Sequence, residues 1–397
     1  MNKKEGIKAV SPIIDTVVLQ SVHSIRPFAA AKRKIILVAG ARPNFMKIAP
    51  LMTMMTKEPL LNPLLVHTGQ HYDKKMSGLF FQQLGIPDPE VNLGVGSGSH
   101  AQQTAAIMNG FEPVLLQHRP AAVLVVGDVN STIACGLVAV KLGITLIHVE
   151  AGLRSFDRTM PEEINRVLTD AISDMLFCSE QSGMDNLRRE GVSCEKTFLV
   201  GNVMIDNLLR HRENARSSNI LDELRLSERS YVLVTLHRPA NVDDSKTLTG
   251  IMGVLEDICH DMPVVFPVHP RTRARLQELQ IPVHNSRLML LDPVGYLEFL
   301  KLMSSARLVL TDSGGVQEET TILRVPCLTL RDNTERPVTL DLGSNRLVGT
   351  EPDRIRHAYR ELLDRAESTT RIPPLWDGRA AERIVAIIRK RLGEAGC

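Results

Sequence analysis

Three carboxylates occupy positions from which they could act together on one small substrate. Asp128 follows the apolar run AVLVVG, Glu150 follows TLIHV, and Glu162 lies in the segment MPEEINR. Acidic groups that follow the carboxyl ends of adjacent parallel strands converge on one edge of a sheet. Like charges held close together separate their pKa values, so one group can be an acid and another a base. A solvated surface position is the alternative for any single one, but the set predicts a site for proton transfer.

Basic side chains stand at comparable strand ends and could neutralise an anionic substrate. Arg42 and Lys47 follow the run KIILVAG, and Pro43 suits the first turn of a helix there. A helix N-terminus attracts anions, although an ordinary turn with solvated charges would contain the same residues. His237 ends the run YVLVTL in the second half, where it would face the carboxylates unless it is a buried core histidine.

A glycine-rich segment at 311–319, TDSGGVQEE, has the features of a nucleotide site. Gly314 and Gly315 allow backbone N–H groups to approach a ligand closely, and the helix start offers its positive end. Glu319 lies one helical turn further on, where it would accept hydroxyls rather than phosphates. The segment predicts a diphosphate beside a ribose, and Ser313 could cap the helix at the same time.

A second glycine-rich segment, GVGSG at 94–98, follows no clear strand. Because a dinucleotide-binding fingerprint needs a strand before it and a helix after it, we expect a loop over the cleft instead. The sequence has no cluster of metal ligands either, so we expect neither a nicotinamide cofactor nor a metal.

Alternating strands and helices must position these residues. Short apolar runs recur through the first half, at 34–38, 64–67, 122–126, 145–149, 175–178 and 197–200. A second series follows at 231–235, 264–268, 288–291, 308–311 and 327–330. Helix-like periodicity separates most of them, as at 45–55 and 130–142, which is typical of parallel sheets with both faces covered. We predict an α/β protein of two doubly wound domains with a cleft between them.

The same pattern sets the expected domain boundaries. Residues 1–31 precede the first strand and are expected to be a dispensable or poorly ordered extension rather than a targeting signal. The first domain spans 32–206 and the second 207–376, with a charged helical connection at 210–230. The basic segment 377–397 is expected to form a helix that returns to the first domain.

The composition excludes several functional classes. With 397 residues, a net charge of +2 and 4% aromatic residues, the chain has neither a basic field nor a stacking surface for nucleic acid. No apolar run approaches the length of about 20 residues that spans a bilayer. The six cysteines form no CxxC pair, which fits a reducing cytoplasm. We therefore expect a cytoplasmic protein without nucleic-acid or membrane partners.

A series of motifs extends from about residue 34 to the C-terminus: GARPNFMKIAP, HTGQHYD, VVGDVNST, HVEAGLRSFDRTMPEEINR, VGNVMID, THRPAN, PVHPRTR, TDSGGVQEE and LRDNTERP. Their content and order resemble those of the non-hydrolysing UDP-N-acetylglucosamine 2-epimerases. The resemblance implies a GT-B-like fold of two Rossmann-type domains, a homodimer, and activity without NAD or a metal.

The resemblance also implies roles for individual residues. Those that match the family's catalytic groups are Asp128, Glu150, Glu162, His237, Arg42 and Lys47. Those that match its UDP-sugar-binding groups are Arg42, His237, Phe299, Ser313, Gly314, Gly315, Glu319 and Arg331. Phe299 would lie beside the uracil, and Arg331 near the substrate.

Some positions depart from the family's pattern. Pro239 stands where many members have a second arginine, and Tyr72 and Asp73 stand where an arginine and a glutamine often occur. In those members the positions belong to a regulatory UDP-N-acetylglucosamine site, so we expect weak activation by this compound or none.

The implied reaction is the reversible epimerisation of UDP-N-acetylglucosamine at C2 to UDP-N-acetylmannosamine, by elimination of UDP to 2-acetamidoglucal and its re-addition. It would supply N-acetylmannosamine-type sugars for cell-surface polysaccharide. The near alternatives are an epimerase of a UDP-linked diacetamido uronic acid and a hydrolysing epimerase. A glycosyltransferase of the same fold would need an acceptor groove instead of three acidic groups, and a sensor without activity would have no use for them.

Overall fold

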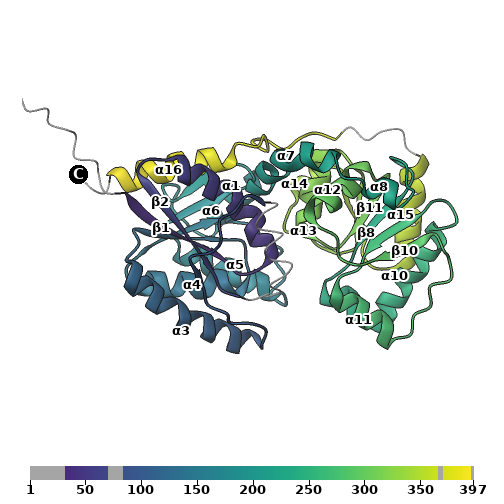
Figure 1. Ribbon diagram of the computed structural model, residues 1–397, viewed down its shortest axis with the longest axis horizontal. Helices are drawn as coiled ribbons and strands as arrows, with labels where there is room; N and C mark the ends of the chain where they lie inside the picture. The colour runs from purple at the N-terminus through teal and green to yellow at the C-terminus, as the bar shows by residue number, and fades with distance from the viewer. Residues whose placement is uncertain (1–31, 70–83, 365–369, 395–397) are drawn as a thin grey trace, which may run out of the picture.

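The computed structural model describes residues 32–69, 84–364 and 370–394, and shows two sheets side by side, each surrounded by helices (Figure 1). The expected extension at 1–31 lies outside the described residues, as do Tyr72 and Asp73. The side chain of Arg42 lies outside them too.

In the described residues the first sheet has seven parallel strands in the order β3-β2-β1-β4-β5-β6-β7. Their bounds are β1 (Arg33–Ala39), β2 (Leu61–His67), β3 (Val91–Asn92), β4 (Ala122–Val126), β5 (Thr145–Val149), β6 (Met175–Cys178) and β7 (Thr197–Leu199). The strand order runs outward from β1 in both directions, so the topological switch point lies between β1 and β4.

Helices cover both faces of this sheet. They are α1 (Arg42–Lys57), α3 (His100–His118), α4 (Asn130–Lys141), α5 (Pro161–Ile172), α6 (Gln181–Arg189) and α7 (Val203–Arg216). Alternate residues of β1 belong to different cores: Ile35 and Leu37 pack with α1, whereas Ile36 and Val38 pack with α3 and α4. Because both faces are buried, the strands appear in the sequence as continuous apolar runs.

The second sheet has six parallel strands in the described residues, in the order β10-β9-β8-β11-β12-β13. The strands are β8 (Val232–Thr235), β9 (Val264–Pro267), β10 (Leu288–Leu291), β11 (Leu308–Thr311), β12 (Cys327–Thr329) and β13 (Asn345–Leu347). Its helices are α8 (Ile220–Glu223), α9 (Pro239–Val242), α10 (Ser245–Ile258), α11 (Pro270–Glu278), α12 (Tyr296–Ser305), α13 (Gly314–Leu323), α14 (Val338–Asp341) and α15 (Pro352–Asp364). This order repeats that of the first sheet, and the switch point lies between β8 and β11.

Helix α7 lies between the halves, and the C-terminal helix α16 (Ala380–Glu394) lies over the first half (Figure 1). α7 packs against α1 on one side and against α12 and α13 on the other, and α16 lies against α1. The Trp376 indole N–H donates to the Ser179 carbonyl at 2.9 Å. Asp206 on α7 accepts the N–H groups of Ala380 and Ala381 at 3.1 and 2.7 Å, and so caps α16.

The expected α/β architecture is confirmed, and the strands predicted at 122–126, 145–149, 175–178, 288–291 and 308–311 coincide with β4, β5, β6, β10 and β11. The sequence pattern missed β3 and β13, which have two and three residues and are too short to show a period. The segment 94–98 does follow a strand, β3, contrary to our expectation.

The helical connection expected at 210–230 is wrong in extent. α7 begins earlier, at Val203, because the side chain of Asn202 accepts the Met204 N–H at 2.9 Å and caps the helix. It ends at Arg216, and the short α8 follows.

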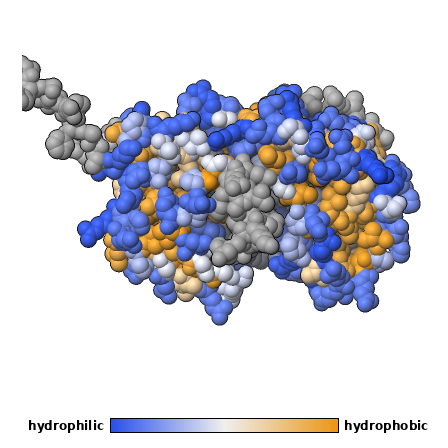
Figure 2. Space-filling view, in the orientation of Figure 1, coloured by the Kyte–Doolittle hydropathy of each residue, from blue (hydrophilic) through white to orange (hydrophobic). Residues whose placement is uncertain are grey.

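No described helix has the length and hydropathy needed to cross a membrane. Figure 2 shows hydrophilic residues over much of the visible face, with smaller hydrophobic groups between them.

Candidate active site

The strand ends at the two switch points carry most of the candidate residues. Asp128 follows β4 and Glu150 follows β5, while His237 follows β8 and Ser313 follows β11. Open α/β sheets bind ligands outside the carboxyl ends of their strands at such points. The two sets of strand ends meet, because Arg336 of the second half contacts Glu150 at 2.6 Å.

Asp128 is held by an arginine of α5. Nη2 of Arg166 lies 2.5 Å from Oδ2 of Asp128, and Nη1 of the same arginine lies 2.6 Å from Oε2 of Glu163. Burial would raise the pKa of Asp128, but the charges of Arg166 and Lys47 outweigh burial and lower it. Asp128 is therefore ionised at neutral pH, and Arg166 holds one of its oxygens.

Glu150 lies between two cations, one from each half of the chain. Its φ of 75° is in the left-handed region, which residues other than glycine seldom adopt. Its carboxylate pairs with Lys47 of α1 and with Arg336, and the residue is only 8% exposed. Lys47 thus lies on the second turn of α1, buried and paired with Glu150, and not in the first turn as a solvated charge.

Glu162 is half-buried in the first turn of α5. Glu162 interacts electrostatically with Arg238 of the second half. Burial and the charge of Arg331 lower the pKa of Arg238, and the charge of Glu162 raises it. All three predicted carboxylates therefore lie near cations at the junction of the halves.

His237 is 45% exposed and is not a buried core histidine. Its Nδ1 lies 2.9 Å from Oδ1 of Asp312, so its closest acidic partner comes from its own half of the chain. The Asp312 carboxylate also accepts the backbone N–H groups of His237 and Arg238 at 3.0 and 2.9 Å. Burial would raise the pKa of Asp312, but the hydrogen bond and charge of His237 lower it. Asp312 therefore fixes the orientation of the imidazole.

The start of α13 is shaped by its glycines. Ser313 stands at the N-cap position, but its side chain makes no capping hydrogen bond. A Cβ at Gly314 would lie 2.4 Å from Nη1 of Arg336, so packing there requires glycine. At Gly315 the nearest atom would be Cε of Met204 at 3.6 Å, an ordinary contact. Packing does not require glycine at 315, and the small residue there leaves the backbone open to a ligand.

The remaining candidates surround this helix. Glu319 is 4% exposed, and the Tyr296 hydroxyl donates to its Oε1 at 3.2 Å. Burial, with a contribution from Glu318, raises the pKa of Glu319 to about 8. Phe299 on α12 is half-buried against the core, and Arg331 lies 2.7 Å from Glu335.

The structure adds four residues that sequence reasoning did not single out: Asp312, Arg166, Glu335 and Arg336. All stand inside the motifs that contain the chosen residues, and Asp312 is next to Ser313. Their partners are remote in the chain: Arg166 and Asp128 are separated by 38 positions, and Arg336 and Glu150 by 186. Their position inside the motifs could have identified these residues as candidates, but their spacing in the sequence does not indicate which residues they pair with.

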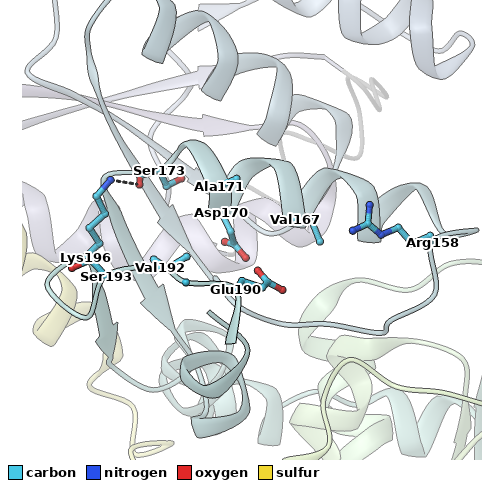
Figure 3. A pocket seen from close by; sticks show the side chains of 10 residues that line it. Arg158, Val167, Asp170, Ala171, Ser173, Glu190, Val192, Ser193 and Lys196 are labelled. Atoms are coloured by element: carbon cyan, nitrogen blue, oxygen red, sulfur yellow. Dashed lines mark hydrogen bonds between the residues drawn. The ribbon is translucent and has the colours of Figure 1, made fainter. Parts of the chain in front are cut away.

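A cavity of about 510 Å³ lies elsewhere in the first half, between α5 and the loop at 190–196 (Figure 3). Figure 3 shows the Asp170 and Glu190 carboxylates close to each other on its wall. No candidate residue lines it. Asp170 instead holds the backbone on both sides of Glu150. It lies 2.6 Å from Nδ1 of His148 and accepts the Gly152 N–H at 3.0 Å. The candidate site therefore lies at the strand ends, where the cations and acids meet.

Within the described ranges, no group of three or more His, Cys, Asp or Glu side chains could hold a metal ion. Cys135, Cys178, Cys259 and Cys327 are buried free thiols, and Cys194 is an exposed one.

Comparison with known proteins gives consistent matches over most of the chain. A family model described as UDP-N-acetylglucosamine 2-epimerase matches residues 53–389. The UDP-N-acetylglucosamine 2-epimerase of Methanocaldococcus jannaschii is 43% identical over 369 residues, which cover 89% of this chain and 98% of the relative. The UDP-2,3-diacetamido-2,3-dideoxy-D-glucuronate 2-epimerase of Pseudomonas aeruginosa is 44% identical over 333 residues, covering 83% and 92%.

The fold is shared with solved structures as well. The crystal structure of the M. jannaschii enzyme in complex with UDP-GlcNAc and UDP has a TM-score of 0.85 to this chain at 43% identity, and the match covers 90% of this chain and 99% of that one. A structure of UDP-GlcNAc 2-epimerase from Neisseria meningitidis bound to UDP-GlcNAc has a TM-score of 0.82 at 30% identity, covering 90% and 100%.

Proposed function

Because the chain belongs to the UDP-N-acetylglucosamine 2-epimerase family, we propose that it interconverts UDP-N-acetylglucosamine and UDP-N-acetylmannosamine by inversion at C2. The observation that carries this proposal is that Glu150, one of the three carboxylates of the first half, pairs with Arg336, which also holds Glu318 on α13. The first half (32–206) supplies the carboxylates, and the second half (207–376) supplies the UDP site of this GT-B-like fold.

The proposed chemistry follows from the substrate. The C2 proton is not next to a carbonyl, so its direct removal would leave a poor carbanion. If the C1–O bond to UDP breaks as a carboxylate takes the C2 proton, the product is neutral 2-acetamidoglucal. UDP then re-forms the C1–O bond while C2 receives a proton on the other face. Cations stabilise the departing diphosphate, and we assign the ionised carboxylate of Asp128 as the proton acceptor.

The direct test is to incubate the purified protein with UDP-N-acetylglucosamine in heavy water and to follow the anomeric signals by NMR. We expect a second UDP-sugar with deuterium at C2. Release of free N-acetylmannosamine would indicate a hydrolysing enzyme, and retention of the original hydrogen would exclude elimination. The P. aeruginosa relative makes the UDP-linked diacetamido uronic acid the competing substrate to assay in parallel.

We further propose a cytoplasmic homodimer that serves cell-surface polysaccharide synthesis. Free thiols in the described residues support a reducing compartment. Sedimentation of the purified chain tests the dimer, and a monomer at micromolar concentration would contradict it.

A further inference from the structure

One arginine joins the two halves at the candidate site. The Arg336 guanidinium donates from Nη2 to Glu150 at 2.6 Å, from Nε to Glu318 at 2.6 Å, and from Nη1 to Glu335. The Arg336 side chain is 7% exposed, so water does not replace any of these three partners.

The three carboxylates come from different parts of the site. Glu150 follows β5 in the first half, Glu318 lies on α13 beside Glu319, and Glu335 lies in the loop after β12. Gly314 leaves the space that the guanidinium fills, since a Cβ there would lie 2.4 Å from Nη1. The first turn of α13 therefore packs directly on the cation that holds Glu150.

The other contacts of Glu335 and Glu150 keep these carboxylates, and therefore Arg336, in fixed positions. Glu335 is also held by Arg331 at 2.7 Å and lies 3.7 Å from Arg238, and the second oxygen of Glu150 pairs with Lys47. A planar guanidinium serves several acceptors at fixed angles, which the ammonium of lysine does not reproduce.

We propose that Arg336 is a positioning residue that ties the alignment of Glu150 to helix α13, so that the bound nucleotide and the carboxylate are held as one unit. This inference rests on the proposed function, which assigns Glu150 to the sugar. An arginine with a purely structural role would contribute to the free energy of unfolding without acting through Glu150.

A double-mutant cycle separates these roles. Arg336→Lys should lower kcat about a hundredfold with little change in KM, because misplacing a reacting group costs about that much. In a Glu150→Gln background the same substitution should cost less than about threefold, since the group through which it acts is gone. In a Glu162→Gln background it should retain its full effect. Full loss in both backgrounds, or wild-type kcat for Arg336→Lys, overturns the proposal.

The matched control is Arg356→Lys in α15. Arg356 also bridges two carboxylates, Asp257 at 2.7 Å and Asp353 at 2.9 Å, but at the surface. It should leave kcat and KM unchanged. A comparable loss of kcat in this control would mean that any such bridge matters, which contradicts a specific role for Arg336.

A second measurement does not depend on turnover. Binding of UDP alone should slow amide hydrogen exchange in the segment after β5, at 150–154, in the wild type and in Arg356→Lys but not in Arg336→Lys. Equal protection in all three proteins overturns the proposal. A wild type that binds UDP but converts no UDP-sugar would refute the proposed function, and the exchange result would still decide the role of Arg336.

Discussion

The ionic partners of each residue determine what it can do at this site. Burial raises the pKa of Glu319 to about 8, so this group is protonated at neutral pH. Asp128 is ionised, since burial acts against it but Arg166 lowers its pKa. Under the proposed function, the neutral acid would lie beside the ribose and the carboxylate would accept the proton.

Asp128→Asn and Glu319→Ala should affect different steps. Asp128→Asn removes a proton acceptor and should abolish turnover while UDP affinity stays within about twofold of the wild type. Glu319→Ala removes a hydrogen-bond acceptor and should weaken UDP binding about tenfold, or about 1.4 kcal/mol. Calorimetric titration with UDP and the epimerase assay measure both quantities. Equal loss of UDP affinity in the two variants would refute the assignment.

Glu319 should also make stability depend on pH. Burial raises its pKa to about 8 in the folded chain, from an ordinary value of 4.5. Between these values the unfolded state gives up its proton first, so the free energy of unfolding falls as pH rises from about 4.5 to 8. Glu319→Gln removes this contribution. Its melting temperature relative to the wild type should therefore be higher at pH 8 than at pH 5. Parallel curves for the two proteins would contradict the shift.

Secondary structure was predictable where burial on both faces leaves a continuous apolar run, as in β4 and β5. It was not predictable where a cap decides the boundary: Asn202 starts α7 ahead of the expected connection. For a related reason, the sequence predicted the candidate residues of the site but not their ionic partners. A motif shows that Asp128 or His237 stands at a strand end, but the partners Arg166 and Asp312 depend on the three-dimensional fold.

The first turn of α13 offers a test in which neighbouring glycines serve as each other's control. Gly314→Ala forces a Cβ against the Arg336 guanidinium and should destabilise the protein by about 1–3 kcal/mol. Gly315→Ala meets only Met204 at 3.6 Å and should change stability by less than about 0.5 kcal/mol. Urea unfolding measures both values. If the two variants were equally stable, Arg336 would not be packed against this turn.

At the scale of the whole molecule, one apolar cluster runs through both halves. It contains Ile35 and Leu37 of the first sheet, Leu233 and Val309 of the second, and Leu208 of α7 between them. Each half also has a cluster of its own, around Ile36 in the first half and Val232 in the second. Because the shared cluster joins the halves, we expect them to unfold in one cooperative transition.

Leu208→Ala tests this shared core. Leu208 is fully buried where α7 packs between the halves, so truncation should cost about 2–5 kcal/mol. Leu116→Ala makes the same chemical change at a residue that is 57% exposed and should cost less than about 0.5 kcal/mol. Thermal unfolding can be followed by far-UV circular dichroism and by the fluorescence of Trp376, the single tryptophan of the sequence. Both signals should give the same midpoint in the wild type, and both midpoints should fall together in Leu208→Ala. Two separate transitions, or a shift in only one signal, would show that the halves unfold independently and that α7 does not join their cores.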